Sequence, residues 1–582
     1  MIVNSLTTVA RVFLTLSITV APGVANASEV GANDFRISDM GPDGDVDFRG
    51  STPSIAYNSQ DHEYLVVFNG IDLPSGETEV YGRRLDGATG APLGATDFRI
   101  SNIGPEGNDL LNGLSASVAY NSADNEYLVS FWGDAVIDQS FFQVFAQRLN
   151  AAGEEIGAND FRISDVTGQM TTVVYNSVEN EYFVIWMAES EPGTLDTEVF
   201  GQRLSATGEE LGPEIRISHM SPAGDDDFLG IFPSLAYNSI ANEYLVVWHG
   251  RTEGINSDDL EVFGQRLDGA TGAEVGTDDF RISSMGDDAA GNFNFIGADA
   301  AVAFNGVRNE YLVVWRGTDD PSPGHEREIY GQRLDALGNE IGTDDVRISH
   351  VGPDGNINFG ARSPAVTYNS LDDEYLVVWQ ADDGGSQLDE ELEIYTQRID
   401  GATGEAVGPM SARVSDQGPD RFDFDALSPA AIYNPVAHEY LVVWHGDDNL
   451  APLVDGELEI FGQRLDGDAS SVDLTMRTIP AIPRIPAIGG SFDFVLQVEN
   501  LTNEEQTIDF WNTVTLESGQ TVGPVFGPFT VTLGPGEVVN RRRTQAITAA
   551  PGPGVHTFTL NVGSHPDVVS VRKDRVFQIL EE

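Results

Sequence analysis

The chain has 582 residues, of which 92 are Asp or Glu and 31 are Lys or Arg, so its formal net charge at pH 7 is −61. A surface this negative repels phosphate backbones, which excludes nucleic acid as an expected partner. The chain has no cysteine, which excludes disulfides, thiol catalysis and cysteine-ligated zinc.

Residues 1–27 have the pattern of a secretory signal peptide. Arg11 carries the positive charge, an apolar stretch follows over residues 12–20, and small residues end the segment at Ala25-Asn26-Ala27. The apolar stretch is shorter than the roughly 20 residues that a membrane-spanning helix needs. We therefore expect cleavage after Ala27, a secreted or extracellular location and no transmembrane segment. A short buried N-terminal strand or helix is the alternative.

A motif of the type Phe-Arg-Ile-Ser recurs seven times. Three further segments rich in β-branched and aromatic residues lie between successive motifs, and in the first repeat they span residues 55–57, 63–68 and 79–85. Turn-forming residues bound each segment, so the segments are expected to be strands A, B and C, with the motif itself as strand D. The motif arginines are Arg36, Arg99, Arg162, Arg216, Arg281, Arg347 and Arg413.

Four short strands repeated seven times predict a seven-bladed β-propeller over residues 28–468. Strand B is apolar at successive positions, as in Leu65-Val66-Val67, which indicates that both of its faces are buried between blades. The first strand D precedes the first strand A, and the last repeat stops after its strand C. The ring is therefore expected to close by pairing residues 35–38 with the strands of residues 428–466. A β-solenoid is the alternative.

After the repeats, residues 469–582 predict an all-β domain of another kind. Seven short segments alternate apolar and polar residues between turn signals, which is typical of an immunoglobulin-like or fibronectin-like β-sandwich.

Two charged residues recur in every repeat. One catalytic site would break a sevenfold repeat, so these residues are interpreted as structural ion pairs between neighbouring strands. The strand-B glutamates are Glu63, Glu126, Glu181, Glu243, Glu310, Glu374 and Glu439, and the strand-C arginines are Arg84, Arg148, Arg203, Arg266, Arg333, Arg398 and Arg464.

The loops after strands D and B vary in length and are acidic, so the propeller face that carries them is the candidate binding face. Two D–A loops place oxygen side chains at alternate positions, which is the ligand type that Ca²⁺ prefers. The EF-hand pattern is not met, and Asp and Asn in turns also hydrogen-bond their own backbone, so both interpretations stay open. These metal-ligand candidates are Asp43, Asp45, Asp47, Asp354, Asn356 and Asn358.

The end of strand B is where the repeats differ. His249 and His445, close in sequence to acidic residues, are candidates for acid/base chemistry, although chance placement also explains them. The aromatic rings that precede them are candidates either for packing between blades or for stacking on a sugar. The ligand-binding candidates are Trp248, Trp444, Arg316, Asp447 and Asp448.

The pattern Ala-Tyr-Asn-Ser, Glu-Tyr-Leu-Val-Val-Trp and Phe-Gly-Gln-Arg-Leu resembles the repeats of exported bacterial β-propeller proteins of mostly unassigned function over residues 34–466. The C-terminal region resembles the Ig-like modules appended to such proteins. The favoured hypothesis is a secreted or cell-surface scaffold that binds a glycan or a protein through one propeller face. The alternative is a secreted carbohydrate-active enzyme, a lyase or hydrolase that uses His249 or His445.

Overall fold

The structure, a computed structural model, describes a chain that is all β. The described residues are 29–71, 76–104, 107, 111–134, 142–165, 167–190, 196–220, 229–251, 260–285, 296–318, 326–351, 359–382, 392–417, 425–447, 453–454, 456–467, 472–479, 484–486, 489–500, 505–515, 521–548, 554–564 and 568–579. The expected signal peptide lies outside them. No helix able to cross a membrane occurs among these residues.

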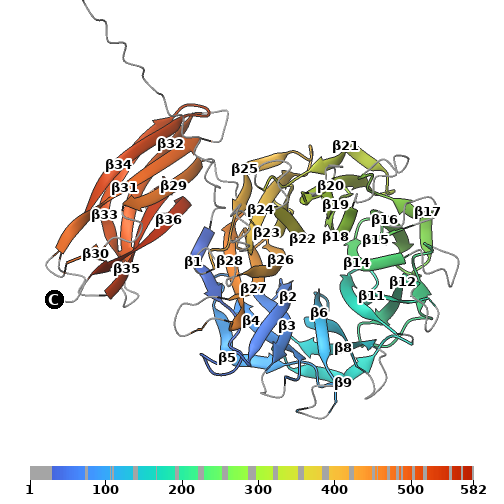
Figure 1. The fold of residues 1–582 in the computed structure, drawn as a ribbon. Coiled ribbons are helices and arrows are strands. Elements are labelled where there is room, and N and C mark those ends of the chain that lie inside the picture. Colours follow the sequence, from blue (N-terminus) through green and yellow to red (C-terminus); the bar gives the residue numbers. More distant parts are fainter. Residues whose placement is uncertain are drawn as a thin grey trace, which may run out of the picture.

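Seven sets of four antiparallel strands, called sheets 1 to 7 below, follow one another along the chain and are arranged around a common axis (Figure 1). A parallel contact between Thr197 and Leu229 joins sheets 3 and 4 into one eight-stranded sheet. Sheets 1 to 3 consist of β2 (Arg49–Asn58), β3 (Glu63–Ile71), β4 (Glu79–Asp86) and β5 (Pro92–Arg99); β6 (Gly113–Asn121), β7 (Glu126–Asp134), β8 (Phe142–Asn150) and β9 (Glu155–Arg162); and β10 (Gln169–Asn176), β11 (Glu181–Glu189), β12 (Thr197–Ser205) and β13 (Ile215–Arg216).

Sheets 4 to 7 repeat the same order. They consist of β14 (Leu229–Asn238), β15 (Glu243–Arg251), β16 (Glu261–Asp268) and β17 (Glu274–Arg281); β18 (Ile296–Asn305), β19 (Glu310–Thr318), β20 (Glu328–Asp335) and β21 (Glu340–Arg347); β22 (Gly360–Asn369), β23 (Glu374–Asp382), β24 (Leu392–Asp400) and β25 (Ala406–Arg413); and β26 (Ala426–Asn434), β27 (Glu439–Asp447) and β28 (Leu458–Asp466), with β1 (Glu29–Arg36) as the fourth strand of sheet 7.

Strand β1 connects the two ends of the repeat region. It pairs antiparallel with β28, and Phe35 lies opposite Gly462. The backbone amides of Ile37 and Ser38 continue the contact by donating to the carbonyl of Ile460. Sheets 7 and 1 also share a buried cluster that includes Ile37, Tyr57 and Leu441.

Each sheet packs against its two neighbours in the ring, and we call these two interfaces seams. Apolar side chains of the second strand of each sheet pack into both seams. Leu65 and Val67 belong to the cluster shared with sheet 2, whereas Val66 belongs to the cluster shared with sheet 7. All three are fully buried, as the run of successive apolar residues predicts.

Two sets of ion pairs lie inside each sheet. The recurrent strand-B glutamate pairs with the strand-C arginine in all seven sheets, for example Glu243 with Arg266 at 2.6 Å. The strand-D arginine pairs in six sheets with a buried glutamate near the start of strand C, such as Glu79 or Glu261. Recurrence in the sequence did not identify this buried glutamate as the partner of the strand-D arginine, because sheet 2 has Gln143 at the equivalent position.

A hydrogen bond at the outer edge joins each sheet to the next. In every case a backbone amide just after strand D donates to a side chain that lies on, or directly before, the outer strand of the following sheet, over 2.6–3.1 Å. The donor–acceptor pairs are Asp39–Asp97, Asn102–Asp160, Asp165–Glu214, His219–Asp279, Ser284–Asp345, His350–Ser411 and Asp416–Asp34. We call these the outer-edge acceptors. The last pair joins sheet 6 to sheet 7 and completes the set of seven seams.

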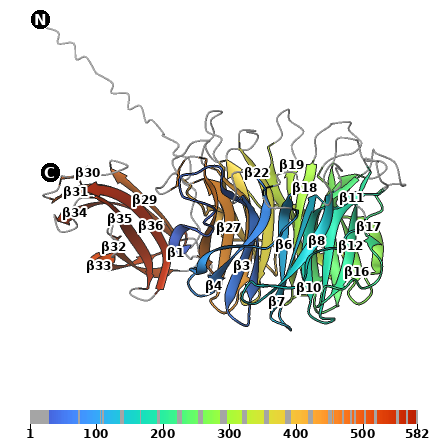
Figure 2. The same cartoon turned by 90° about the horizontal axis from the view of Figure 1, so that it is seen from below.

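The C-terminal region forms two further sheets, seen beside the ring in Figures 1 and 2. One has the order β29-β31-β34 and the other the order β30-β36-β35-β32-β33. Both contribute to one buried cluster that includes Phe494 and Phe558, whose ring centroids lie 5.1 Å apart. The strands are β29 (Val472–Ile479), β30 (Arg484–Ile485), β31 (Gly489–Asn500), β32 (Gln506–Thr515), β33 (Thr521–Leu533), β34 (Val538–Thr548), β35 (Gly554–Ser564) and β36 (Val568–Ile579).

Candidate functional site

A cavity of about 460 Å³ lies on the axis of the ring. The first strand of each of the seven sheets, which we call the inner strand, contributes to the wall of this cavity. The cavity is therefore the place where all seven sheets meet. Its lining residues are 52–54, 115–117, 170–172, 232–233, 299–300, 363–364 and 428–429.

Each inner strand changes register where it lines this axial cavity, and one residue adopts a left-handed backbone conformation with φ between 48° and 56°. None of the seven is glycine, so the conformation costs energy and must be held by its surroundings. These bulge residues are Thr52, Ser115, Met170, Phe232, Asp299, Ser363 and Ser428.

Four bulges are held by a side chain from the preceding sheet. The residue that follows the buried aromatic of strand B accepts a hydrogen bond from the bulge amide, whatever its chemical type. The pairs are Asn69 with Ser115 at 2.8 Å, His249 with Asp299 at 3.1 Å, Gln380 with Ser428 at 2.7 Å and His445 with Thr52 at 3.3 Å.

Both histidines therefore hold the seams together. Each accepts through Nδ1, which requires that this nitrogen carry no proton. Burial lowers the pKa of His249 and of His445 to about 4, so both rings are neutral at pH 7. In His249 the Asp299 carboxylate opposes this lowering of the pKa. Neither Nδ1 is free to take a proton from a substrate.

Sheets 4 and 5 break the symmetry of the axial cavity. The Phe232 ring is 41% exposed and stacks on the His249 imidazole, with centroids 5.3 Å apart and planes within 10°. Beside them, Arg316 Nε lies 3.3 Å from Asp299 Oδ2. We call these four residues the axial cluster; Phe232 and Asp299 line the cavity directly.

The axial cluster pairs one cation, Arg316, with one carboxylate, Asp299, and two further arginines act on Arg316 electrostatically. Burial lowers the pKa of Arg316; Asp299 opposes that shift, whereas the positive charges of Arg327 and Arg362 add to it. Among the described residues that line the cavity, Asp299 is the one carboxylate. The cluster thus offers an aromatic face, guanidinium donors and a carboxylate acceptor within one small area.

Most of the sequence-based ligand candidates lie elsewhere. Trp248 and Trp444 are fully buried in seams between sheets and expose no ring face to a ligand, so Phe232 replaces them as the accessible aromatic residue. Asp447 is buried, and its Oδ2 accepts a hydrogen bond from the Gly456 amide. Asp448 lies outside the described residues. Of the candidates, only Arg316 and His249 join the axial cluster.

The described calcium candidates make contacts within their own segment. Asp43 Oδ1 lies 2.6 Å from Arg36 Nη1, and Asp45 Oδ1 accepts from the Asp47 amide at 3.2 Å. The other three, Asp354, Asn356 and Asn358, lie outside the described residues. Elsewhere, His219, Asp278 and Asp279 place ligand-type atoms within 4.8 Å of one another, but two of the three are exposed and Asp279 already accepts the His219 amide.

Sequence reasoning missed Phe232, Asp299 and Arg362. The other inner strands mostly place Thr or Ser at the bulge, as in Thr52 and Ser363, so an aromatic or charged residue at that repeat position was the signal available. It was not recognised because the bulge itself has no glycine or Asn-Gly signature.

No family model and no curated protein sequence matches the chain. Several solved structures are similar to the chain, each with a TM-score below 0.5. They include the β-propeller domain of the Trilobed protease from Pyrococcus furiosus (TM-score 0.38, 9% identity, covering 72% of this chain and 95% of that one). An exo-β-1,3-galactanase from Phanerochaete chrysosporium matches with TM-score 0.31 and 11% identity over 95% and 100% of the two chains. An α-L-arabinofuranosidase from Lactobacillus brevis matches with TM-score 0.32 and 9% identity over 53% and 98%. No activity is carried over from these proteins.

Proposed function

We propose that the protein is a secreted binding scaffold that recognises a carbohydrate at the axial cavity. The observation that carries this proposal is the axial cluster, in which an exposed Phe232 ring lies beside the Asp299–Arg316 ion pair. Sugar rings present an apolar C–H face and several hydroxyls. An aromatic face next to a carboxylate and a guanidinium matches both features.

The ion pair suits a neutral sugar better than a polyanion. Asp299 accepts hydrogen bonds from hydroxyls, and Arg316 donates to hydroxyl and ring oxygens. A polyanionic glycan is disfavoured because the whole chain carries a net charge of −61.

Binding is favoured over hydrolysis by the acid/base groups around the cavity. Most glycoside hydrolases use two carboxyl groups, about 5 to 10 Å apart. Asp299 is the single carboxylate among the described lining residues, and the Nδ1 atom of its neighbour His249 is already engaged. A protein with this arrangement is expected to hold a sugar without cleaving it.

The proposal includes a location and an architecture. We infer that residues 1–27 direct export and that the seven sheets form a closed seven-bladed propeller through the β1–β28 pairing. We also infer that residues 469–582 make up an immunoglobulin-like sandwich. A rigid ring holds the axial cluster in place, and an appended sandwich separates it from any surface that anchors the chain. Bound Ca²⁺ remains a proposal for the loops that carry Asp43 and Asp354.

The experiment is a binding screen of the mature protein on immobilised neutral and acidic oligosaccharides, followed by titration of any hit. Phe232→Ala and Arg316→Ala are each expected to weaken binding at least tenfold, which corresponds to about 1.4 kcal/mol. Phe529→Ala is the matched control, because Phe529 is 55% exposed but lies in the C-terminal sheets. Undiminished binding by Phe232→Ala would place the site elsewhere. Release of new chain ends from a bound glycan would make the protein an enzyme.

A further inference from the structure

Outer-strand side chains fill the seams between neighbouring sheets in a repeated way. Five of them pack against a turn glycine in the next sheet, so that a Cβ built on that glycine would lie only 2.4–3.2 Å from the side chain. The pairs are Phe35 with Gly90, Phe98 with Gly153, Phe161 with Gly208, Ile215 with Gly272 and Phe280 with Gly338.

A second glycine contacts the other side of the ring. It lies on strand C of the sheet whose outer strand carries that ring. A Cβ on Gly82 would lie 2.8 Å from the Phe98 ring, and one on Gly264 would lie 3.0 Å from the Phe280 ring. The Phe98 and Phe280 rings are therefore each held between two glycines, whereas the Phe161 ring lies between Gly208 and Ala146. A methyl group added at a glycine that contacts the Phe98 or Phe280 ring would produce a steric clash unless the ring shifts.

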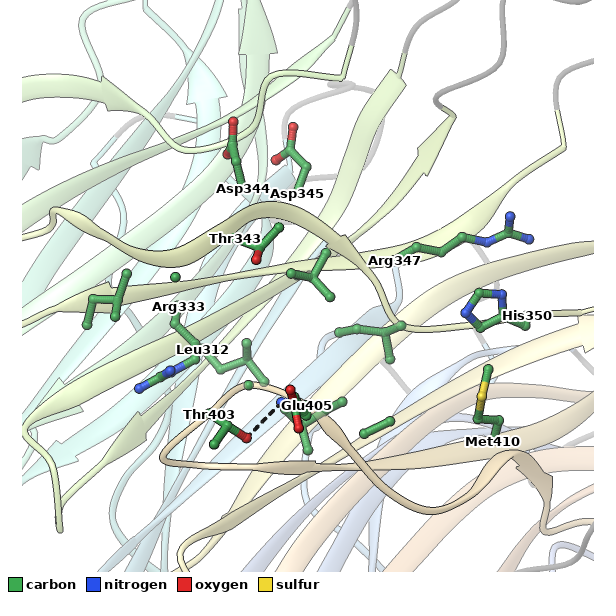
Figure 3. A pocket seen from close by; sticks show the side chains of 18 residues that line it. Leu312, Arg333, Thr343, Asp344, Asp345, Arg347, His350, Thr403, Glu405 and Met410 are labelled. Atoms are coloured by element: carbon green, nitrogen blue, oxygen red, sulfur yellow. Dashed lines mark hydrogen bonds between the residues drawn. The ribbon is translucent and has the colours of Figure 1, made fainter.

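The seam between sheets 5 and 6 keeps both glycines but lacks the ring. Val346 stands at the outer-strand position, and a Cβ on Gly331 or on Gly404 would meet no aromatic side chain there. A pocket of about 540 Å³ lies at this place, and both glycines line it (Figure 3). The pocket thus coincides with the position that a phenyl ring occupies in four other seams.

The walls of this seam pocket are suited to an aromatic group. Six aliphatic residues line it, namely Leu312, Ile341, Val346, Ile348, Ile399 and Ala406. An aromatic ring placed among them buries apolar surface, at roughly 25 cal/mol for each Å² removed from water. Three carboxylates and two arginines also line the pocket, so its formal charge of about −1 disfavours a ligand that carries a negative charge. They are Asp344, Asp345, Glu405, Arg333 and Arg347.

Arg333 supplies the polar contact. At other seams the equivalent arginine donates through Nη1 to a turn carbonyl of the next sheet, as Arg84 does to Ala152 and Arg266 to Leu337. Arg333 is 8% exposed and pairs with Glu310 through Nη2, but its Nη1 makes no such bond to the turn of residues 401–405 and its buried Nε has no hydrogen-bond partner. Its side chain lies at one end of the pocket in Figure 3.

We propose that the seam pocket binds a neutral aromatic ring that carries a hydrogen-bond acceptor, the chemistry of a benzamide. The ring occupies the space between Gly331 and Gly404, and the carbonyl accepts a hydrogen bond from Arg333. This site is separate from the axial cluster, so it stands or falls independently of carbohydrate binding.

The test uses benzamide as the probe and ligand-observed NMR as the readout. Wild-type protein is expected to bind benzamide saturably at one site, cyclohexanecarboxamide and benzoate more weakly, and acetamide not at all. Val346→Phe restores the ring that the other seams contain, so it is expected to abolish benzamide binding while the Tm stays equal or rises. Benzamide binding that survives Val346→Phe, or that acetamide competes away, would overturn the proposal.

A second variant gives the opposite prediction. Phe280→Val removes the ring between Gly264 and Gly338 and so creates a similar pocket between sheets 4 and 5. The number of benzamide molecules bound is expected to rise from one to two, with a lower Tm because a cavity has been made. An unchanged stoichiometry in folded Phe280→Val would show that the two glycines do not define a ring-binding site.

Discussion

The Nδ1 atom of His445 accepts a hydrogen bond from the backbone amide of Thr52, a residue 393 positions away in the chain. The contact joins the last sheet to the first at a bulge whose backbone is left-handed at Thr52. Asn69 and Gln380 make the same contact at other seams. One geometric role is therefore filled by three residue types that share only an acceptor atom.

This contact predicts the effect of substituting His445. His445→Ala leaves the Thr52 amide without its acceptor, at a cost of about 1–3 kcal/mol in the free energy of unfolding. His445→Gln is expected to recover most of that loss, because Gln380 holds the equivalent bulge at 2.7 Å. Urea-induced unfolding of the two variants measures the difference. If alanine and glutamine cost the same, the hydrogen bond contributes nothing to stability.

The outer-edge acceptors predict how stability depends on pH. Burial raises the pKa of Asp97, Asp160 and Asp345 to about 6, and that of Asp279 to about 7, against a value of 3.8 for an exposed carboxyl. The native state therefore holds these protons more tightly than the unfolded state. Their stabilising contribution is complete below pH 3.8 and is lost as the pH rises through 6 to 7.

The buried histidines have the opposite sign in a different window. With a folded pKa of about 4 and an ordinary value of 6.5, their contribution is complete above pH 6.5 and is lost as the pH falls through 4. Of these two sets of groups, only the outer-edge acceptors still titrate between pH 6.5 and pH 8. We therefore expect the Tm to fall as the pH is raised across this window in thermal melts at constant ionic strength.

Asp279→Asn tests which group is responsible. Asparagine keeps an acceptor for the His219 amide but carries no charge, so its Tm at pH 8 is expected to match or exceed that of the wild type, with a flatter pH dependence. Asp47→Asn is the matched control, because Asp47 is exposed and is not among the charges that raise the pKa of Asp279. Equal pH slopes for the two variants would exclude Asp279 as the cause.

Much of the fold could be predicted from the sequence because its determinants recur. Successive apolar residues such as Leu65, Val66 and Val67 specify a strand buried on both faces, and the recurrence of Glu63 and Arg84 indicates an ion pair. The site was less predictable. Recurrence reveals residues that stay the same, whereas His445 and Asn69 share a role without sharing an identity, and the Phe232 bulge has no local signature.

The strand-B to strand-C ion pairs are expected to be costly to break singly. Arg266 and Glu243 have side chains only 7% and 17% exposed, so Arg266→Met leaves a carboxylate unpaired in a region of low solvent access. We expect a loss of about 3–5 kcal/mol, much of it recovered in the double variant with Glu243→Gln. Denaturant unfolding measures both.

Arg542→Met is the control for that experiment. Arg542 pairs with Asp493 at the same 2.6 Å distance, but its side chain is 64% exposed. Solvent screens such a pair, so no measurable loss of stability is expected. A loss as large as that of Arg266→Met would mean that burial is not what makes the inner pairs costly to break.

The last prediction separates stability from binding at the axial cavity. Phe232 has φ 51°, a conformation that a bulky side chain adopts only at a cost of about 1–2 kcal/mol, and its exposed ring makes limited packing contacts. Phe232→Gly is therefore expected to leave the free energy of unfolding unchanged or to raise it, while carbohydrate binding is lost. Met170→Gly relieves the same backbone strain at φ 52° in the same cavity but outside the axial cluster, so it is expected to keep binding. If Phe232→Gly destabilises the protein strongly, the Phe232 side chain is needed for the fold. If both variants lose binding, the side chains of the bulge residues around the cavity are needed for binding in general. Only a loss of carbohydrate binding that is confined to Phe232→Gly would identify the aromatic face of Phe232 as the part of the propeller that binds the ligand.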